Sequence, residues 1–253
     1  MSDSINRNPH PDFKTVEASR EKWDPSSKFS YVQTPDPNWK FGQGSNSLPD
    51  PGKDKKHVSI DPYEEGRPGA LNYKLLISAI TPRPIAMVST RSSDGKTENL
   101  AVFSYFNVIN HDPPLFIIGI ASAMAEAKDT LRNIMDTKEA VINIISEPIL
   151  EAANSTSINA PFGAPEWDVS GLTRDYSCET VKCARVKEAV FSIEAKLDML
   201  KEWESRATPG KKTGTLVILE GTRMWAREDA INEDRSIIDP AVSYFITPFS
   251  QFL

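Results

Sequence analysis

The fold is decided by residues 82–114, which read PRPIAMVSTRSSDGKTENLAVFSYFNVINHDPP. Residues 85–90 form a short apolar run ahead of the turn signal Ser93-Asp94-Gly95, a pattern typical of a buried strand that enters a hairpin. Pro113 and Pro114 end whatever precedes them, and the apolar run 115–120 then indicates a core strand. This stretch therefore predicts short, closely spaced strands.

The rest of the chain adds brief helices and further strands to this pattern. Apolar residues at helical spacing predict helices near 70–80, which Pro82 must end, at 129–135 with Asp129 as N-cap, and at 148–157. We expect strands at 140–145, 191–197 and 216–219, a turn at Thr208-Pro209-Gly210, and a loop at 159–171. Short strands with few helices between them indicate a mainly β fold that closes, wholly or partly, into a barrel.

The chain divides into three parts by composition. Residues 1–61 are rich in proline, and their apolar residues recur with neither the period of a strand nor that of a helix. They are therefore expected to form an irregular N-terminal extension. Five aromatic residues between 23 and 41 suggest that this extension docks on an apolar surface. Residues 62–242 hold the periodic pattern and form the predicted domain, and 243–253 are an apolar C-terminal tail.

The composition excludes several classes of partner. The 253 residues include 29 basic and 35 acidic side chains, and a net charge of -6 argues against binding to nucleic acid or anionic lipid. The longest apolar run, 115–121, is much shorter than the roughly 20 residues of a membrane-spanning helix. Residues 1–30 hold no apolar signal segment, so we expect a cytoplasmic protein that does not enter a membrane.

The common catalytic signatures are absent from the sequence. There is no G-x-G-x-x-G nucleotide motif and no G-x-S-x-G nucleophile elbow, and the three histidines form no metal-binding pattern. Gly210-Lys211-Lys212-Thr213 resembles the end of a P-loop, but Ser205 occupies the position of its first glycine. Cys178 and Cys183 are expected to be free thiols. An enzyme of this kind would take its reactivity from a cofactor, so no catalytic side chain and no metal ligand is assigned.

Taken in order, the motifs resemble one known family. They are R-P-x-x-x-V-S-T at 83–90, a D-G turn, N-x-A-x-x-S-x-F at 99–106, D-P-P at 112–114, T-x-x-N-I at 130–134 and V-I-N-I at 141–144. This series is similar to the flavin reductase-like, FMN-binding split-barrel family, and the likeness extends to about residue 225. The resemblance implies an antiparallel, Greek-key split β-barrel that binds FMN.

The resemblance also implies which residues would bind the cofactor. The backbone of Asn99, Leu100 and Ala101 would follow the isoalloxazine edge, Ser104 would hydrogen-bond the flavin or its phosphate, Tyr105 and Phe106 would wall the site, and Thr90 would close it. Lys128 and Thr130 would bind the phosphate where a helix begins, because its unpaired N–H groups and dipole favour an anion. The alternative for residues 99–106 is an ordinary aromatic-rich barrel strand. For Lys128 and Thr130 it is a solvated lysine and an ordinary second residue of the helix.

Two further positions are left open at this point. Arg83 is as compatible with a contact to the cofactor phosphate as with an ion pair to a carboxylate. Residues 160–163 with Glu166 and Trp167 are as compatible with the rim of the isoalloxazine as with an ordinary surface loop.

The activity implied is that of an FMN-dependent oxidoreductase. In this family NAD(P)H passes hydride to the flavin, which then reduces an acceptor, and the protein is expected to be a homodimer with the flavin near its interface. Relatives carry an R-L-G-G-x-x-Y stretch after the segment that corresponds to 234–242, whereas this chain reads SYFITPFSQFL at 243–253. A non-catalytic FMN-binding protein is therefore the alternative. A split-barrel oxidase or heme-handling protein is a third, less favoured interpretation, because this sequence has no suitably placed histidine on a strand.

Overall fold

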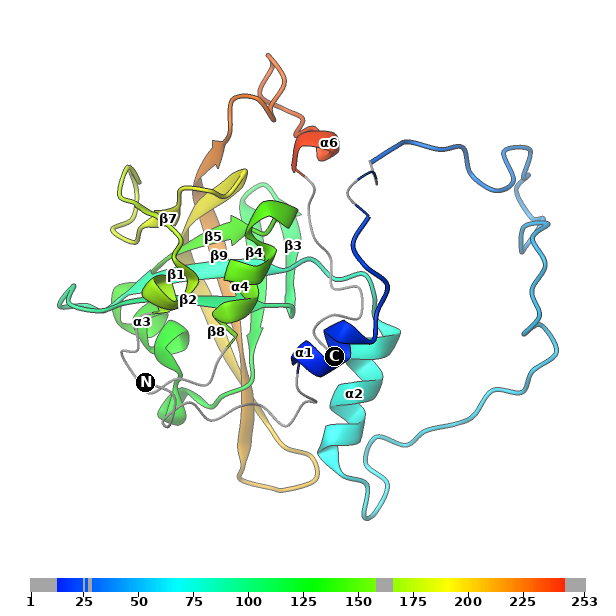
Figure 1. Ribbon diagram of the computed structural model, residues 1–253. Helices are drawn as coiled ribbons and strands as arrows, with labels where there is room; N and C mark the ends of the chain where they lie inside the picture. Colours follow the sequence, from blue (N-terminus) through cyan, green and yellow to red (C-terminus); the bar gives the residue numbers. More distant parts are fainter. Residues whose placement is uncertain (1–12, 25, 27–28, 158–165, 244–253) are drawn as a thin grey trace.

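A seven-stranded antiparallel sheet forms the body of the protein (Figure 1). The computed structural model describes residues 13–24, 26, 29–157 and 166–243. The strands follow the order β2-β1-β5-β8-β9-β4-β3. Their bounds are β1 Ala86–Arg91, β2 Glu98–Phe103, β3 Phe106–His111, β4 Pro114–Ile120, β5 Glu139–Ile144, β8 Phe191–Glu204 and β9 Lys212–Ala226. A separate pair consists of β6 (Arg174–Asp175) and β7 (Arg185–Val186).

The two edges of the sheet come from consecutive strands. Only Ser104 and Tyr105 separate the end of β2 from the start of β3, yet these strands lie at opposite ends of the strand order. The backbone N–H of Gly119 in β4 donates to the Tyr105 carbonyl oxygen at 2.7 Å, and β2 also contacts β4. The sheet therefore curls until its edges approach each other, which confirms the prediction of a mainly β, antiparallel, partly closed barrel.

Both faces of β1 are buried, which explains the apolar residues Ala86, Met87 and Val88 in its first half. Ala86 and Val88 face one core cluster together with residues of β4, α3 and β9, while Met87 faces a second cluster that contains Leu100 and Trp167. Alternate side chains of a strand point to opposite faces, so a strand covered on both sides holds apolar residues or, as at Ser89 and Thr90, polar side chains with buried hydrogen bonds. The strand thus separates two apolar compartments.

The helices are short, as the sequence predicts. They are α1 (Phe13–Ala18), α2 (Gly69–Ala79), α3 (Asp129–Thr137), α4 (Leu150–Ser155), α5 (Glu166–Ser170) and α6 (Pro240–Ser243), with 3₁₀ turns at Met124–Glu126 and Glu147–Ile149. The predicted N-cap of α3 is wrong by one residue: Lys128 has the extended backbone of a cap, and Asp129 is the first helical residue. A carboxylate there still complements the helix dipole.

The predicted loop at 159–171 is wrong in its second half. Residues 158–165 lie outside the described residues, but Glu166–Ser170 forms α5, which packs near β2 and α4. Trp167 is 1% exposed and lies in the same cluster as Leu100. A helix of five residues is too short for apolar spacing to reveal it.

The extension before α2 is irregular apart from α1, and Figure 1 shows it as a wide loop beside the barrel. Its aromatic side chains between residues 23 and 41 are exposed. Phe41 is 100% and Trp23 67% exposed, while Phe29 contacts Tyr31 and Trp39 contacts Phe41 edge-on. The expected docking on an apolar surface is therefore not seen for these side chains among the described residues. The predicted tail, apart from Ser243 in α6, lies outside the described residues.

Within the described part of the chain, no helix is both long enough and apolar enough to cross a membrane.

Candidate functional site

Two buried hydrogen bonds attach the start of α3 to the β1–β2 hairpin. The Asn99 side-chain amide donates to the Thr130 hydroxyl at 2.8 Å, and the Asn133 amide donates to the Thr90 hydroxyl at 3.1 Å. All four side chains are buried. Thr90 and Asn99 are paired across the hairpin, so the two bonds lie side by side. The structure therefore brings together three predicted site residues, and it adds Asn133, which the family motif contains but which was not assigned to the site.

The first turn of α3 has features that favour an anion. Its N-cap residue Lys128 has an exposed side chain, which makes no capping hydrogen bond to the helix. The N–H groups at a helix start and the helix dipole attract negative charge. Because Thr130 is buried and bonded to Asn99, its hydroxyl fixes the position of this turn.

Ser104 and Tyr105 form the corner between β2 and β3. The Ser104 side chain is half-buried and that of Tyr105 is 42% exposed, whereas Leu100 is fully buried. Tyr105 lies against Gly119, where a Cβ would come within 3.0 Å of the tyrosine Cβ. Burial raises the pKa of the Tyr105 phenol, with Tyr73 adding to the effect and Arg83 opposing it. The exposed aromatic face at the corner is that of Tyr105.

The neighbouring predicted residues lie deeper. Phe106 is 8% exposed and its ring stacks on Phe116 with a centroid distance of 6.3 Å, inside the main core cluster. Ala101 is half-buried in β2. Phe106 therefore supports the corner from the core side.

Arg83 forms no ion pair with a carboxylate among the described residues. Its guanidinium donates to the carbonyl oxygen of Ile77 at 2.6 Å and also to that of Ile80, at the end of α2. The buried Nε has no hydrogen-bond partner. The side chain therefore satisfies carbonyl groups at a helix C-terminus, where a cation is favoured.

A buried carboxyl group lies next to β2. Glu166 is 7% exposed, and its Oε2 atom has no hydrogen-bond partner. Burial raises the pKa of this carboxyl group and the nearby Asp129 adds to the rise, while the backbone N–H groups of Glu166 and Leu100 oppose it. Glu166 thus lies beside both β2 and the start of α3, the two elements that contribute the predicted site. Sequence reasoning left it undecided because a lone glutamate in a proline- and glycine-rich segment carries no pattern.

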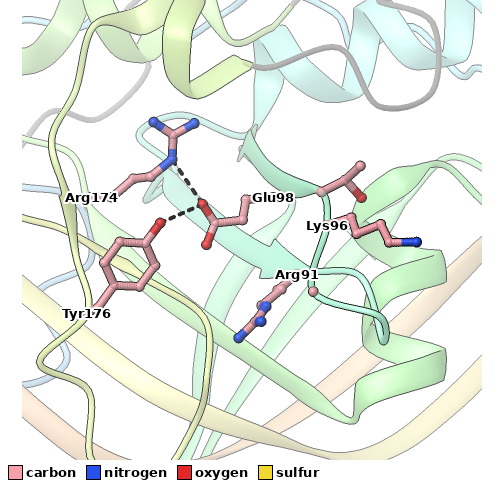
Figure 2. A pocket seen from close by; sticks show the side chains of 7 residues that line it. Arg91, Lys96, Glu98, Arg174 and Tyr176 are labelled. Atoms are coloured by element: carbon pink, nitrogen blue, oxygen red, sulfur yellow. Dashed lines mark hydrogen bonds and ion pairs between the residues drawn. The ribbon is translucent and has the colours of Figure 1, made fainter.

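A separate polar pocket opens on the other face of the hairpin (Figure 2). Its volume is about 470 Å³, and its charged and aromatic lining consists of Arg91, Lys96, Glu98, Arg174 and Tyr176. Sequence reasoning did not find this pocket, because its residues come from segments about 80 positions apart that contact each other only in the folded chain.

The cysteines and acidic residues offer little other chemistry. Cys178 and Cys183 are free, as predicted, and burial raises the pKa of their thiols to about 11 and about 12. Both are thus protonated at neutral pH and unsuited to act as nucleophiles. Among the residues described, no group of three or more His, Cys, Asp or Glu side chains could hold a metal ion.

Comparison with known proteins finds similar sequences and similar folds. An uncharacterized protein of Aquifex aeolicus is 43% identical over 126 residues, which are 49% of this chain and 63% of that protein, so the match spans less than two thirds of that relative. Nitrilotriacetate monooxygenase component B from Bacillus cereus matches with a TM-score of 0.69 and 31% identity, over 76% of this chain and 91% of that one. The structure of 2-nitrobenzoate 2-nitroreductase NbaA from Pseudomonas fluorescens matches with a TM-score of 0.61 and 28% identity, over 76% of this chain and 86% of that one.

The family model described as flavin reductase like domain matches residues 78–245, which include every strand of the sheet and both elements of the candidate site. The resemblance in the sequence and the split-barrel fold are thereby confirmed, and this chain belongs to the flavin reductase like domain family.

Proposed function

We propose that this chain binds FMN between the first turn of α3 and the β2–β3 corner, and that it acts as an NAD(P)H-dependent oxidoreductase. The observation that carries the proposal is the pair of buried bonds, Asn99 to Thr130 and Asn133 to Thr90. They fix the start of α3, which carries Lys128 and Asp129, against the strand whose residues the family resemblance assigns to the flavin. Family membership supports a flavin-related oxidoreductase, and FMN with a nicotinamide donor is the specific form proposed here.

The donor set fits a flavin mononucleotide. Lys128 and the N–H groups at the start of α3 would hold the phosphate, and Ser104 offers a hydroxyl at the corner. Tyr105 offers an aromatic face, and the backbone of Asn99, Leu100 and Ala101 lies on an edge strand, where N–H and C=O groups are open to a ligand. When bound, the flavin supplies the redox chemistry by accepting and returning hydride.

The residues of the chain would then orient the substrates and exclude water. None of them needs to move a proton, since the reaction belongs to the cofactor. Tyr105 would position the ring, and the buried cluster around Leu100 and Trp167 would keep solvent from the far side of β2. The side chains of this site would therefore position the cofactor and substrates and would take no part in the chemical step.

We also propose that the active form is a homodimer. The edge strand β3 exposes Val108 and Ile109, at 56% and 48%, a few residues from Tyr105. Apolar side chains on an open sheet edge are a surface that a second chain would cover. Size-exclusion chromatography with light scattering tests this: a homodimer would have a mass close to twice the 28.1 kDa of one chain.

The test is a titration of the full chain with FMN, followed by measurement of NADH and NADPH oxidation. Quenching of flavin fluorescence with a saturable curve, together with oxidation of either nucleotide, is the expected result. A chain that binds no FMN would disprove the whole proposal. A chain that binds FMN and oxidises neither nucleotide would be a non-catalytic flavoprotein.

A further inference from the structure

The pocket in Figure 2 lies one residue further along the hairpin than the candidate flavin site. Thr90 pairs with Asn99, and the next pair towards the turn is Arg91 with Glu98. Successive side chains of a strand point to opposite faces, so Arg91 and Glu98 project away from the side that carries α3. A ligand bound here would not compete with the groups that contact α3.

Part of the pocket is held rigid by hydrogen bonds. The Glu98 carboxylate accepts from the Tyr176 hydroxyl at 2.9 Å and from Nε of Arg174 at 2.9 Å, and Figure 2 shows both bonds reaching the same oxygen. Arg174 also pairs through Nη2 with Asp168 at 3.1 Å. These contacts order one wall and leave the other Glu98 oxygen, Oε1, without a hydrogen bond among the described residues.

The pocket lining also includes a cation, Arg91, that has no counter-ion among the described residues. Arg91 is half-buried, and its guanidinium has no hydrogen-bond or ion-pair partner in the part of the chain that the structure describes. It lies directly on Gly95, where a Cβ would come within 2.0 Å of Nη2. Lys96 pairs with Asp94 at 3.3 Å, but its side chain is 81% exposed, so this pair binds it weakly.

We propose that this pocket binds the adenosine 2′-phosphate end of NADPH. This rests on the proposed function, and it identifies the donor. Arg91 presents a planar fork of donors that matches a phosphate group, and Lys96 adds a second positive charge. Oε1 of Glu98 is an acceptor for a hydroxyl or amino group of the nucleoside. A volume of about 470 Å³ holds much more than a single ion.

The direct test is calorimetric titration of the full chain, without flavin, with adenosine 2′,5′-bisphosphate. The wild-type chain should bind this probe more tightly than it binds AMP or inorganic phosphate. Arg91→Ala should weaken binding about tenfold or more, the value expected for a lost charged hydrogen-bonding group. Arg227→Ala is the matched control, because it removes the same charge from an exposed pair with Asp229 and should bind as the wild type does.

A second variant keeps every charge. Arg91→Lys keeps the positive charge but removes the planar fork of donors, so it should also weaken binding of the probe, whereas the circular dichroism spectrum should stay that of the wild type. Absence of binding to the wild-type chain, or equal loss in Arg91→Ala and Arg227→Ala, would overturn the inference.

Kinetics separate this inference from the proposed function. In the FMN-loaded chain, Arg91→Ala should raise KM for NADPH and leave KM for NADH unchanged. If the chain oxidises both nucleotides with equal KM and binds no bisphosphate, the proposed function stands and the inference about this pocket is wrong. If the chain binds the bisphosphate through Arg91 but oxidises neither nucleotide, the phosphate site stands and the proposed reductase function is wrong.

Discussion

The side-chain amide of Asn99 in β2 donates a 2.8 Å hydrogen bond to the hydroxyl of Thr130 in α3, and both groups are buried. Replacing Thr130 by valine keeps the shape and leaves the buried amide unpaired, at a cost of about 1–3 kcal/mol. We therefore expect Thr130→Val to lower the urea midpoint and to weaken FMN binding. Thr213→Val, at an exposed position, should change neither. An unchanged FMN affinity in a destabilised Thr130→Val chain would show that the bond serves the fold alone.

Lys128 should distinguish FMN from riboflavin. If its ammonium group contacts the phosphate, Lys128→Ala will lower the affinity for FMN about tenfold, as expected for one charge-assisted contact. The affinity for riboflavin, which has no phosphate, will stay unchanged. Fluorescence quenching gives both dissociation constants. Lys196→Ala, an exposed lysine on β8, is the control. Equal weakening of FMN and riboflavin would place Lys128 at the ring instead of the phosphate.

Glu166 should make stability fall as the pH rises. Burial raises its pKa above the ordinary value of 4.5, with Asp129 adding to the rise, so the folded chain holds this proton more tightly than the unfolded chain does. The stabilising contribution is complete below pH 4.5 and is lost as the pH rises through the raised pKa. Glu166→Gln should therefore gain stability relative to wild type between pH 5 and 8, measured by urea unfolding. A difference that does not vary with pH would contradict this.

Glu194 should have the opposite pH dependence. Burial acts to raise the pKa of its carboxyl group, but the Thr180 hydroxyl, the Glu179 and Thr180 N–H groups and the Trp225 indole donate to it and together lower it. Its contribution is therefore present above pH 4.5 and is lost as the pH falls through the lowered pKa.

Glu194→Gln should cost about 2–4 kcal/mol at pH 7, because an amide cannot accept all of these bonds. The cost should shrink as the pH falls below the ordinary value of 4.5. Glu188→Gln is a suitable control, since Glu188 is exposed and accepts from one backbone N–H group, that of Thr173. A loss for Glu194→Gln no larger than that control would contradict the prediction.

Local sequence pattern was sufficient for the elements that a periodic or apolar run defines. The run at 85–90 became β1 and the helical spacing at 129–135 became α3, because in both the buried face is recorded in consecutive residues. The strands predicted at 191–197 and 216–219 are in fact the 14 residues of β8 and the 15 of β9. Their outer parts project beyond the sheet, where Met199 and Trp203 are half exposed, so alternation is lost there.

The family motif gave the candidate site more completely than residue pattern could. It selected Thr90, Asn99 and Thr130, which do meet, but it could not give their bonding, because β2 and α3 are brought together only by the fold. Glu166 and the Arg91 pocket depend on contacts between segments far apart in the chain. No short-range signal in the sequence records such contacts.

The long β8–β9 hairpin has a consequence for the order of folding. Its two strands are neighbours near the middle of the sheet and are joined by residues 205–211, whereas β4 and β5, which flank them, come from much earlier in the chain. Local pairings close small loops at low entropic cost and form faster than distant ones. The β8–β9 hairpin can therefore form early, as can the β1–β2 and β3–β4 hairpins, and the sheet is completed when the distant pairings of β5 with β8 and of β4 with β9 bring these hairpins together.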